Sequence, residues 1–290
     1  MTCREIIESI TTRLSNLYDL REARAIARVL VSERAGIPVS ALLTDPGAEL
    51  RIEGLEADAE RLADGVPLQY VVGAAEFYGR RFAVREGVLI PRPETEELVD
   101  RLVRSERRGP GTTAGEVPGA LRILDVGTGS GCIAASLALE LPGAEVFAAE
   151  IADEALAVAE ENFRRLGARV TLRRADALNG LEAQFPEKFD VIVSNPPYVP
   201  ASDRAAMHPN VRDHEPAVAL FVPDDDPLRF YRAIARAGRR MLRPGGRLWF
   251  EIYEHAAEAM REMLAGEGYT DTIVYKDLFD KDRITCSRRK

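Results

Sequence analysis

Cysteine and histidine are scarce in this chain of 290 residues, with three of each. Cys3, Cys132 and Cys286 are widely spaced and form no Cys-x-x-Cys pair, so the sequence offers neither a disulfide framework nor a zinc cluster. The histidines lack the His-Glu-x-x-His spacing of a zinc-binding helix. We therefore expect reduced cysteines and no bound metal.

Long hydrophobic runs and an excess of positive charge are missing as well. No apolar stretch approaches the roughly 18 residues that span a membrane, and Arg4 and Glu5 place charge where a signal peptide would soon need its apolar stretch. The 39 Lys and Arg against 47 Asp and Glu give a net charge of −8, which argues against a protein that coats phosphate backbones. We expect a cytoplasmic protein with no membrane contact and no direct nucleic-acid binding.

Apolar residues, by contrast, make up 46% of the chain, enough to bury a core, and a length of 290 favours two domains. The first third reads as helical. Ile6, Ile10 and Leu14 recur at helical spacing, and Asp19 with Glu22 predicts a capping box at the start of a second helix. We expect residues 1–66 to form a small helical bundle.

Residues 67–92 interrupt this helical pattern. Strand-like pieces at 69–72 and 81–84 are separated by glycines, which favours a β-hairpin linker. A helix with Leu98 and Leu102 on one face should follow, and residues 105–119, rich in Gly, Pro and polar residues, are expected to form a mobile loop.

From Leu121 onward, strand-like runs alternate with helical ones. Strands are expected at 122–126, 145–149, 170–172, 189–194 and 247–252, and helices near 131–140, 153–166 and 227–242. This alternation is typical of a parallel sheet covered by helices on both faces, and strands near 271–275 and 283–286 would complete it. The expected class is α/β, with residues 93–290 as a Rossmann-like domain whose ligands lie beyond the carboxyl ends of the central strands.

The first of these strands ends in the glycine-rich turn Asp125-Val-Gly-Thr-Gly-Ser-Gly131. A dinucleotide fingerprint would need its third glycine where Cys132 stands. The observed spacing instead resembles the nucleoside loop of S-adenosylmethionine methyltransferases, and an ordinary strand-to-helix turn is the alternative. We expect cofactor contacts from Gly127, Thr128, Gly129, Ser130 and Gly131.

Acidic residues follow the next two strands. Glu150 ends the second strand about 20 residues after the loop, where a carboxylate can accept hydrogen bonds from two ribose hydroxyls. Asp176, with Ala177 beside it, follows the third strand, where such folds meet an adenine amino group. Considered alone, Asp176 could equally cap a helix. We expect all three residues at the cofactor.

The strongest signal is Asn195-Pro196-Pro197-Tyr198, directly after the fourth strand. The prolines restrict the backbone and remove its donors, so the Pro196 carbonyl and the Asn195 side-chain oxygen can accept side by side. Two adjacent acceptors match one NH₂ group, and Tyr198 offers a flat face for a planar amide or base. We expect Asn195, Pro196 and Tyr198 to be catalytic, all four residues to bind substrate, and Asn195 also to contact the cofactor.

This motif occurs together with Leu89-Ile-Pro-Arg-Pro-Glu-Thr-Glu96, Pro67-Leu-Gln-Tyr70 and Val211-Arg-Asp-His-Glu-Pro216. The combination resembles the peptide chain release factor glutamine methyltransferases, the PrmC or HemK family, over nearly the whole chain. The resemblance implies a class I S-adenosylmethionine-dependent methyltransferase domain. It further implies methylation of the side-chain amide nitrogen of the glutamine in the Gly-Gly-Gln motif of translation release factors. Release factors are thus the expected partners, held in part by the helical domain, and we expect a monomer.

The chain departs from the family pattern at two places. Glu251-Ile252-Tyr253 has Tyr253 where the family commonly has Gly, and Glu150 replaces a more common Asp. The sequence leaves open whether Arg92 and Glu94 line the site or only shape the entry to the following helix.

Two other functions compete with this interpretation. An adenine amino methyltransferase acting on DNA or RNA would present the same two N–H donors from a flipped base. Asp in place of Asn195 would be more usual there, and the negative net charge argues against it. A non-catalytic methyltransferase-like binding module is the second alternative, because a fold alone does not establish activity. Such a module has no need of both a cofactor loop and a pair of acceptors.

Overall fold

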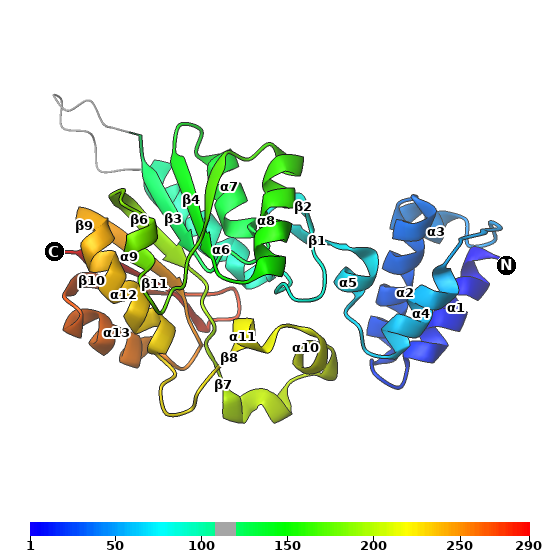
Figure 1. Cartoon of the computed structure of the whole chain (residues 1–290). Helices are drawn as coiled ribbons and strands as arrows, with labels where there is room; N and C mark the ends of the chain where they lie inside the picture. The colour runs from blue at the N-terminus through cyan, green and yellow to red at the C-terminus, as the bar shows by residue number, and fades with distance from the viewer. Residues whose placement is uncertain (108–119) are drawn as a thin grey trace. The chain divides into compact units, whose positions relative to one another are not determined.

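The computed structural model describes residues 1–107 and 120–290 (Figure 1). The loop expected at 105–119 lies outside the described residues except for 105–107, which form the end of a helix. The chain divides into two compact units. The first is Met1–Ala74 with Met207–His214, and the second is Ala75–Ala206 with Glu215–Lys290.

The first unit is helical. Its helices are α1 (Cys3–Leu14), α2 (Leu20–Ala35), α3 (Val39–Thr44), α4 (Leu55–Ala63), α5 (Leu68–Val72) and α10 (Pro209–His214). Thr2 and Glu5 form a capping box at the start of α1. The Asp19 side chain accepts a hydrogen bond from the Glu22 backbone N–H at the start of α2, and Gly36, with φ of +66°, ends this helix in the left-handed region.

The prediction of a strand at 69–72 was wrong, because these residues belong to α5. Pro67 stands at the N-cap of this helix, and Gly73 ends it with φ of +79°. Tyr70 and Val71 are buried. The tertiary environment has therefore overridden the strand preference of a run rich in Tyr and Val.

Helix α10 belongs to the helical unit although more than 130 residues of chain separate it from α5. The His208 ring stacks on Tyr18, with 5.2 Å between the ring centroids. The Nε2 atom of His208 lies 3.3 Å from the Leu17 carbonyl oxygen, and the Asn210 side chain donates to the Tyr18 hydroxyl at 3.4 Å. These contacts join Met207–His214 to the loop that follows α1.

The second unit contains the sheets. Its strands are β1 (Ala74–Phe77), β2 (Arg80–Ala83), β3 (Arg122–Val126), β4 (Glu145–Glu150), β5 (Val170–Arg174), β6 (Phe189–Ser194), β7 (Val199–Pro200), β8 (Phe221–Val222), β9 (Leu242–Glu251), β10 (Tyr269–Lys276) and β11 (Asp282–Arg289). Its helices are α6 (Pro93–Arg107), α7 (Cys132–Glu140), α8 (Asp153–Leu166), α9 (Leu181–Gln184), the 3₁₀ helix η1 (Ala201–Ala206), α11 (Ala217–Leu220), α12 (Arg229–Met241) and α13 (Ala257–Gly266).

The main sheet of the described residues has seven strands in the order β10-β11-β9-β6-β3-β4-β5. The strands from β9 to β5 are parallel, as expected, but β11 runs antiparallel to both β9 and β10. The sheet is therefore mixed rather than wholly parallel. The reason is that residues 277–281 connect β10 to β11 directly, and so short a connection suits only antiparallel neighbours.

Alternating side chains of the strands supply two apolar layers. Ile123 and Val191 face a layer that contains residues of α6, α7 and α8, whereas Leu124 and Ile192 face a layer built from α9, α12 and α13. Figure 1 shows these two groups of helices on opposite faces of the sheet. The expected α/β class, with helices on both faces and a helical N-terminal region, is confirmed.

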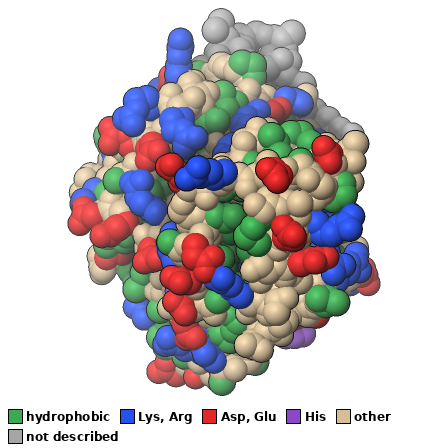
Figure 2. Space-filling model, turned by 90° about the vertical axis from the view of Figure 1, so that its right-hand side faces the viewer, with side chains coloured by type: hydrophobic (Ala, Val, Ile, Leu, Met, Phe, Trp, Pro, Cys, Tyr) green, Lys and Arg blue, Asp and Glu red, His purple; other side chains and the backbone are tan. Residues whose placement is uncertain are grey.

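Charges of both signs are mixed over the surface. On the face shown in Figure 2, Lys and Arg side chains are interspersed with Asp and Glu side chains. Within residues 1–107 and 120–290, no helix has both the length and the apolar character needed to cross a bilayer.

Candidate active site

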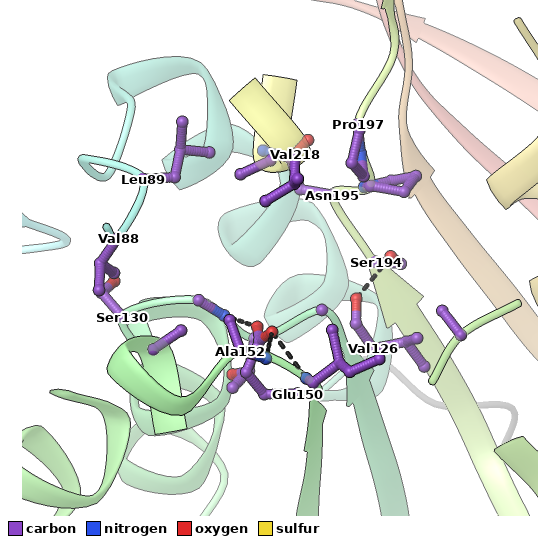
Figure 3. A pocket seen from close by; sticks show the side chains of 18 of the residues that line it. Val88, Leu89, Val126, Ser130, Glu150, Ala152, Ser194, Asn195, Pro197 and Val218 are labelled. Atoms are coloured by element: carbon purple, nitrogen blue, oxygen red, sulfur yellow. Dashed lines mark hydrogen bonds between the residues drawn. The ribbon is translucent and has the colours of Figure 1, made fainter. Parts of the chain in front are cut away.

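A cavity of about 360 Å³ opens at the carboxyl ends of β3, β4 and β6 (Figure 3). This volume is in the range of small-molecule pockets. Expected cofactor residues that line it are Gly127, Thr128, Gly129, Ser130, Glu150, Asp176, Ala177 and Asn195. We call Gly127–Gly131 with Glu150 and Asp176 the glycine-loop wall, and Asn195–Pro197 with Arg92 and Thr95 the diproline wall. Gly131 and Tyr198 are not among the lining residues.

The glycines of the loop serve two different purposes. Gly127 and Gly129 have φ values of +73° and +56°, and a Cβ atom added to either would meet no described heavy atom within 4 Å. The loop therefore leaves open space beside its backbone. Gly131, with φ of +81°, instead lies against α8, where an added Cβ would be 2.6 Å from Phe163 Cε1. The first two glycines suit a ligand, and the third suits close packing.

Glu150 holds the glycine loop from the end of β4. Its Oε2 accepts a hydrogen bond from the Gly129 backbone N–H at 2.9 Å, and its Oε1 accepts from the N–H groups of Ile151 and Ala152 at 2.7 and 3.0 Å. Figure 3 shows these bonds at the base of the cavity. The carboxylate is thus fixed before any ligand binds. Oε1 already accepts two hydrogen bonds, whereas Oε2 accepts one and can accept a second from the cavity.

Asp176 makes a tight turn after β5. Its Oδ1 accepts from the Leu178 backbone N–H at 2.8 Å, and its Oδ2 accepts from the Asn179 side-chain amide at 2.7 Å. Asp176 therefore stabilises a turn and lines the cavity wall, but it does not cap a helix, because α9 has Gly180 at its N-cap.

Asp125, which sequence reasoning did not assign to the site, lies fully buried beneath the glycine loop. Its Oδ2 accepts from the Thr128 hydroxyl at 2.6 Å and from the Ala134 backbone N–H at 3.2 Å. Its Oδ1 is buried without a hydrogen-bond partner among the described residues. Burial raises the pKa of Asp125 to about 7, because desolvation outweighs the two hydrogen bonds.

The diproline wall depends on side chains from distant parts of the sequence. The Asn195 Nδ2 donates to Thr95 Oγ1 at 3.1 Å, and the Thr95 hydroxyl donates to Glu251 Oε2 at 2.7 Å. No described residue donates to Asn195 Oδ1, so this oxygen is left as an acceptor. Asn195 and Pro197 face the cavity opposite Glu150 and Ala152 (Figure 3).

Tyr198 is positioned by its hydroxyl group, which donates to Glu251 Oε1 at 3.0 Å. Burial, and then the charge of Glu251, raises the pKa of Tyr198. The ring lies beside that of Tyr253, with 6.3 Å between centroids, and the Tyr253 hydroxyl donates to Asp203 Oδ2 at 2.9 Å. Tyr253, which departs from the family pattern, therefore connects the Tyr198 ring to η1.

The structure distinguishes Arg92 from Glu94, two residues whose roles the sequence left open. Arg92 lines the cavity and pairs with Glu215 at 2.5 Å, while Glu94 lies in the first turn of α6 and is absent from the lining residues. The Glu215 carboxylate is buried and also accepts from the Ile90 backbone N–H at 3.1 Å. Only the occurrence of Glu215 and Thr95 inside the quoted motifs could have indicated their importance.

Comparison with known proteins adds a family to this geometry. Residues 5–73 match the family model of the PrmC N-terminal domain, and residues 116–211 match that of the Methyltransferase small domain. The Release factor glutamine methyltransferase of Bacteroides thetaiotaomicron is 45% identical over 285 residues, covering 97% of this chain and 98% of that protein. The chain belongs to the release factor glutamine methyltransferase family.

Other relatives agree with this membership. The Release factor glutamine methyltransferase of Chlorobaculum tepidum is 38% identical, covering 97% of this chain and 96% of that protein. Among solved structures, the 16S rRNA N2 G1207 methyltransferase of Thermus thermophilus, in complex with AdoMet and guanosine, matches with a TM-score of 0.51 at 18% identity. That alignment covers 75% of this chain and 50% of the other, and it supports the fold alone.

Membership of this family makes the chain an S-adenosylmethionine-dependent methyltransferase. The cavity fits this cofactor. Its lining combines apolar side chains such as Val126 and Ile133 with one carboxylate at the end of β4, and open space lies beside Gly127 and Gly129. A nucleoside needs the apolar surface and the carboxylate, and close approach to backbone needs the glycines.

Proposed function

We propose that this enzyme methylates the side-chain amide nitrogen of the glutamine in the Gly-Gly-Gln motif of translation release factors. The observation that carries the proposal is the state of Asn195. Its NH₂ end is occupied by Thr95, so it presents an acceptor beside Pro196, whose nitrogen carries no hydrogen. The names of the relatives support the release factor as substrate.

The glycine-loop wall would hold S-adenosylmethionine, which supplies an electrophilic methyl group. Gly127, Thr128, Gly129 and Ser130 would lie along it, and Gly131 would keep the loop against α8. Glu150 would accept hydrogen bonds from the ribose hydroxyls, and Asp176 with Ala177 would meet the adenine. Asn195 would lie near the methyl group as well as the substrate.

An amide nitrogen is a poor nucleophile because its lone pair is delocalised into the carbonyl group. We propose that Asn195 Oδ1 and the Pro196 carbonyl oxygen each accept one N–H of the glutamine amide, which directs the lone pair toward the methyl group. Tyr198 and Pro197 would flank the amide. The nitrogen lone pair would form the new N–C bond, and the electron pair of the broken S–C bond would stay on the sulfur of the cofactor.

The two acceptors also stabilise the positive charge that develops on nitrogen during transfer. No general base is needed beforehand, because the N–H proton becomes acidic only as the methyl group arrives, and it is then released to solvent. Alignment of this kind can supply up to about 7–11 kcal/mol of a barrier. Orientation therefore matters more than basicity at this site.

The helical domain, residues 1–66, is proposed to help hold the release factor, with residues 67–92 as the linker to the methyltransferase domain, 93–290. Translation places such an enzyme in the cytoplasm. We propose that it works as a monomer without direct nucleic-acid contact, in keeping with the net charge of −8 and the mixed charges of Figure 2.

Labelled S-adenosylmethionine and a purified release factor, followed by peptide mass mapping, test the proposal. We expect one methyl group on the glutamine of the Gly-Gly-Gln peptide, and no labelling of a release factor in which that glutamine is replaced by alanine. Labelling of DNA or RNA adenine instead would favour the nucleic-acid alternative. Cofactor binding without transfer to any of these substrates would favour the binding module.

A further inference from the structure

We propose that Glu251 and Thr95 are positioning residues that decide which end of the Asn195 side-chain amide faces the substrate. The inference rests on the proposed function, because it explains how Asn195 comes to present an oxygen. The three residues lie on separate elements of the second unit: Thr95 in α6, Asn195 after β6 and Glu251 at the end of β9.

The direction of the hydrogen bonds carries the argument. A carboxylate has no hydrogen, so Glu251 Oε2 can only accept from the Thr95 hydroxyl, at 2.7 Å. A hydroxyl has one hydrogen, so Thr95 Oγ1 can then only accept from its other neighbour. That neighbour is Asn195 Nδ2, at 3.1 Å. The charge on Glu251 therefore directs the NH₂ group of Asn195 away from the substrate position and leaves Oδ1 for the glutamine.

The same carboxylate also reaches the other end of the motif. Its Oε1 accepts from the Tyr198 hydroxyl at 3.0 Å, so one side chain positions both Asn195 and Tyr198. The backbone of Glu251 is itself held by the Tyr231 hydroxyl, which donates to its carbonyl oxygen at 3.0 Å. The arrangement is rigid because every member other than Asn195 and Tyr198 is buried.

A purely structural role accounts poorly for a carboxylate at this place. Glu251 is 1% exposed and forms no ion pair within the described residues, although the charge of Arg283, which pairs with Asp277, acts on it. Burial raises the pKa of Glu251, whereas the hydrogen bonds from Thr95 and Tyr198 and the charge of Arg283 oppose this rise and favour the ionised form. Burying a charge outside an ion pair is costly, and apolar residues usually stabilise a core better. A carboxylate is useful here because, unlike an amide, it cannot donate to Thr95 and reverse the hydrogen bonds.

Replacing the Thr95 hydroxyl tests this chain of bonds. Thr95→Val keeps the shape of the side chain but cannot accept from Asn195. We expect its kcat for release factor methylation to fall at least about tenfold, the effect of leaving one buried polar group unpartnered. The KM for S-adenosylmethionine should stay within about twofold. Thr95→Ser retains the hydroxyl and should keep most of the activity.

Thr285→Val is the matched control, because it removes a buried threonine hydroxyl from β11, in the same compact unit as Thr95. The Thr285 Oγ1 has no hydrogen-bond partner among residues 1–107 and 120–290, and no residue of β11 lines the cavity. We expect unchanged kcat and a similar melting temperature. Equal activity of Thr95→Val and Thr95→Ser would overturn the proposal, as would an equal loss in Thr285→Val.

Glu251→Gln tests the direction of the bonds, since its amide can donate to Thr95 and so release the Asn195 amide to turn around. We expect kcat to fall while cofactor affinity is retained. A second measurement needs no substrate: the side-chain ¹⁵N–¹H resonances of Asn195 should shift in Thr95→Val and Glu251→Gln but not in Thr95→Ser. Unshifted resonances in all three variants would refute the positioning role. Failure of the wild-type enzyme to methylate glutamine would refute the proposed function instead.

Discussion

The glycine-loop wall and the diproline wall face one another across the same cavity. They differ in how far apart in the sequence the residues lie that hydrogen bonds join in each wall. Glu150 and Gly129 are 21 positions apart, and the other bonds of Glu150 go to its two following residues. By contrast, 100 positions separate Asn195 from Thr95 and 156 separate Thr95 from Glu251. One wall is therefore organised mainly by consecutive strands and turns, and the other only by the folded sheet. Substitutions should consequently damage cofactor binding on one side and catalysis on the other.

The largest expected effect is on the diproline wall. Asn195→Ala removes one of the two proposed acceptors for the substrate amide, so we expect turnover to fall by about 10²–10³-fold or more, the usual cost of losing one preorganised polar group at the reacting atoms. Cofactor affinity should change less than about twofold, because Glu150 and the glycine loop remain. Single-turnover kinetics and calorimetry measure the two quantities. Loss of cofactor binding in this variant would contradict the division between the walls.

The next largest effect is expected at Gly131. Gly131→Ala would combine the cost of a left-handed conformation, about 1–2 kcal/mol, with a clash against Phe163, and should lower both the melting temperature and cofactor affinity. Gly129→Ala is the control, since an added Cβ there meets no described atom within 4 Å and carries only the conformational cost. Thermal denaturation without cofactor compares the two variants, and the melting temperature of Gly131→Ala should be the lower one. Equal melting temperatures would mean that α8 moves away without penalty.

A smaller effect is expected at Glu150. Glu150→Ala should raise the cofactor dissociation constant tenfold or more, about 1.4 kcal/mol, because it removes the proposed ribose acceptor and releases the Gly129 backbone N–H. At saturating cofactor, turnover should stay close to the wild-type value. Glu145→Ala, at the other end of β4, provides a control with an exposed acidic residue. An unaltered dissociation constant would remove Glu150 from the cofactor site.

The smallest effect concerns Asp125 and pH. Its pKa is raised to about 7 in the folded enzyme by burial, so between about pH 4 and pH 7 the folded state keeps a proton that the unfolded state has lost. This group therefore lowers stability as pH rises through that window and adds no further change well above pH 7. Relative to Asp125→Asn, the wild-type free energy of unfolding should fall by about 1–2 kcal/mol from pH 5.5 to 7. Melting curves of both proteins without cofactor measure the difference, and parallel pH profiles would rule out this titration.

The sequence predicted the elements whose signals are local. Residues 122–126, 153–166 and 189–194 have the bounds expected for β3, α8 and β6, because β-branched runs and helical spacing agree there with burial. The prediction of a strand at 69–72 was wrong, because these residues form a short helix that begins after Pro67 and ends at Gly73. Helix α13 was missed, although Met260 and Leu264 have the spacing of a buried helix face.

The site was predictable to a similar degree. Strand ends and glycine spacing indicated the residues of the glycine-loop wall, and the diproline motif indicated Asn195–Pro197, because each motif is continuous in sequence. Spacing could not reveal that Thr95 and Glu251 meet Asn195, or that Arg92 pairs with Glu215, since those contacts depend on the order of strands in the sheet. The position of Tyr198 outside the cavity lining likewise follows from its bond to Glu251.

Segment Met207–His214, which packs with the N-terminal helices, has a consequence for protein engineering. The Tyr18 side chain makes its ring contact with His208, so a fragment that stops at Ala74 would lack part of its own helical unit. A chimaera that borrows this unit from a relative must exchange two stretches of chain together. Replacement of 1–74 and 207–214 together should preserve the contacts between these two stretches. Replacement of either stretch alone would place residues from two different proteins against each other.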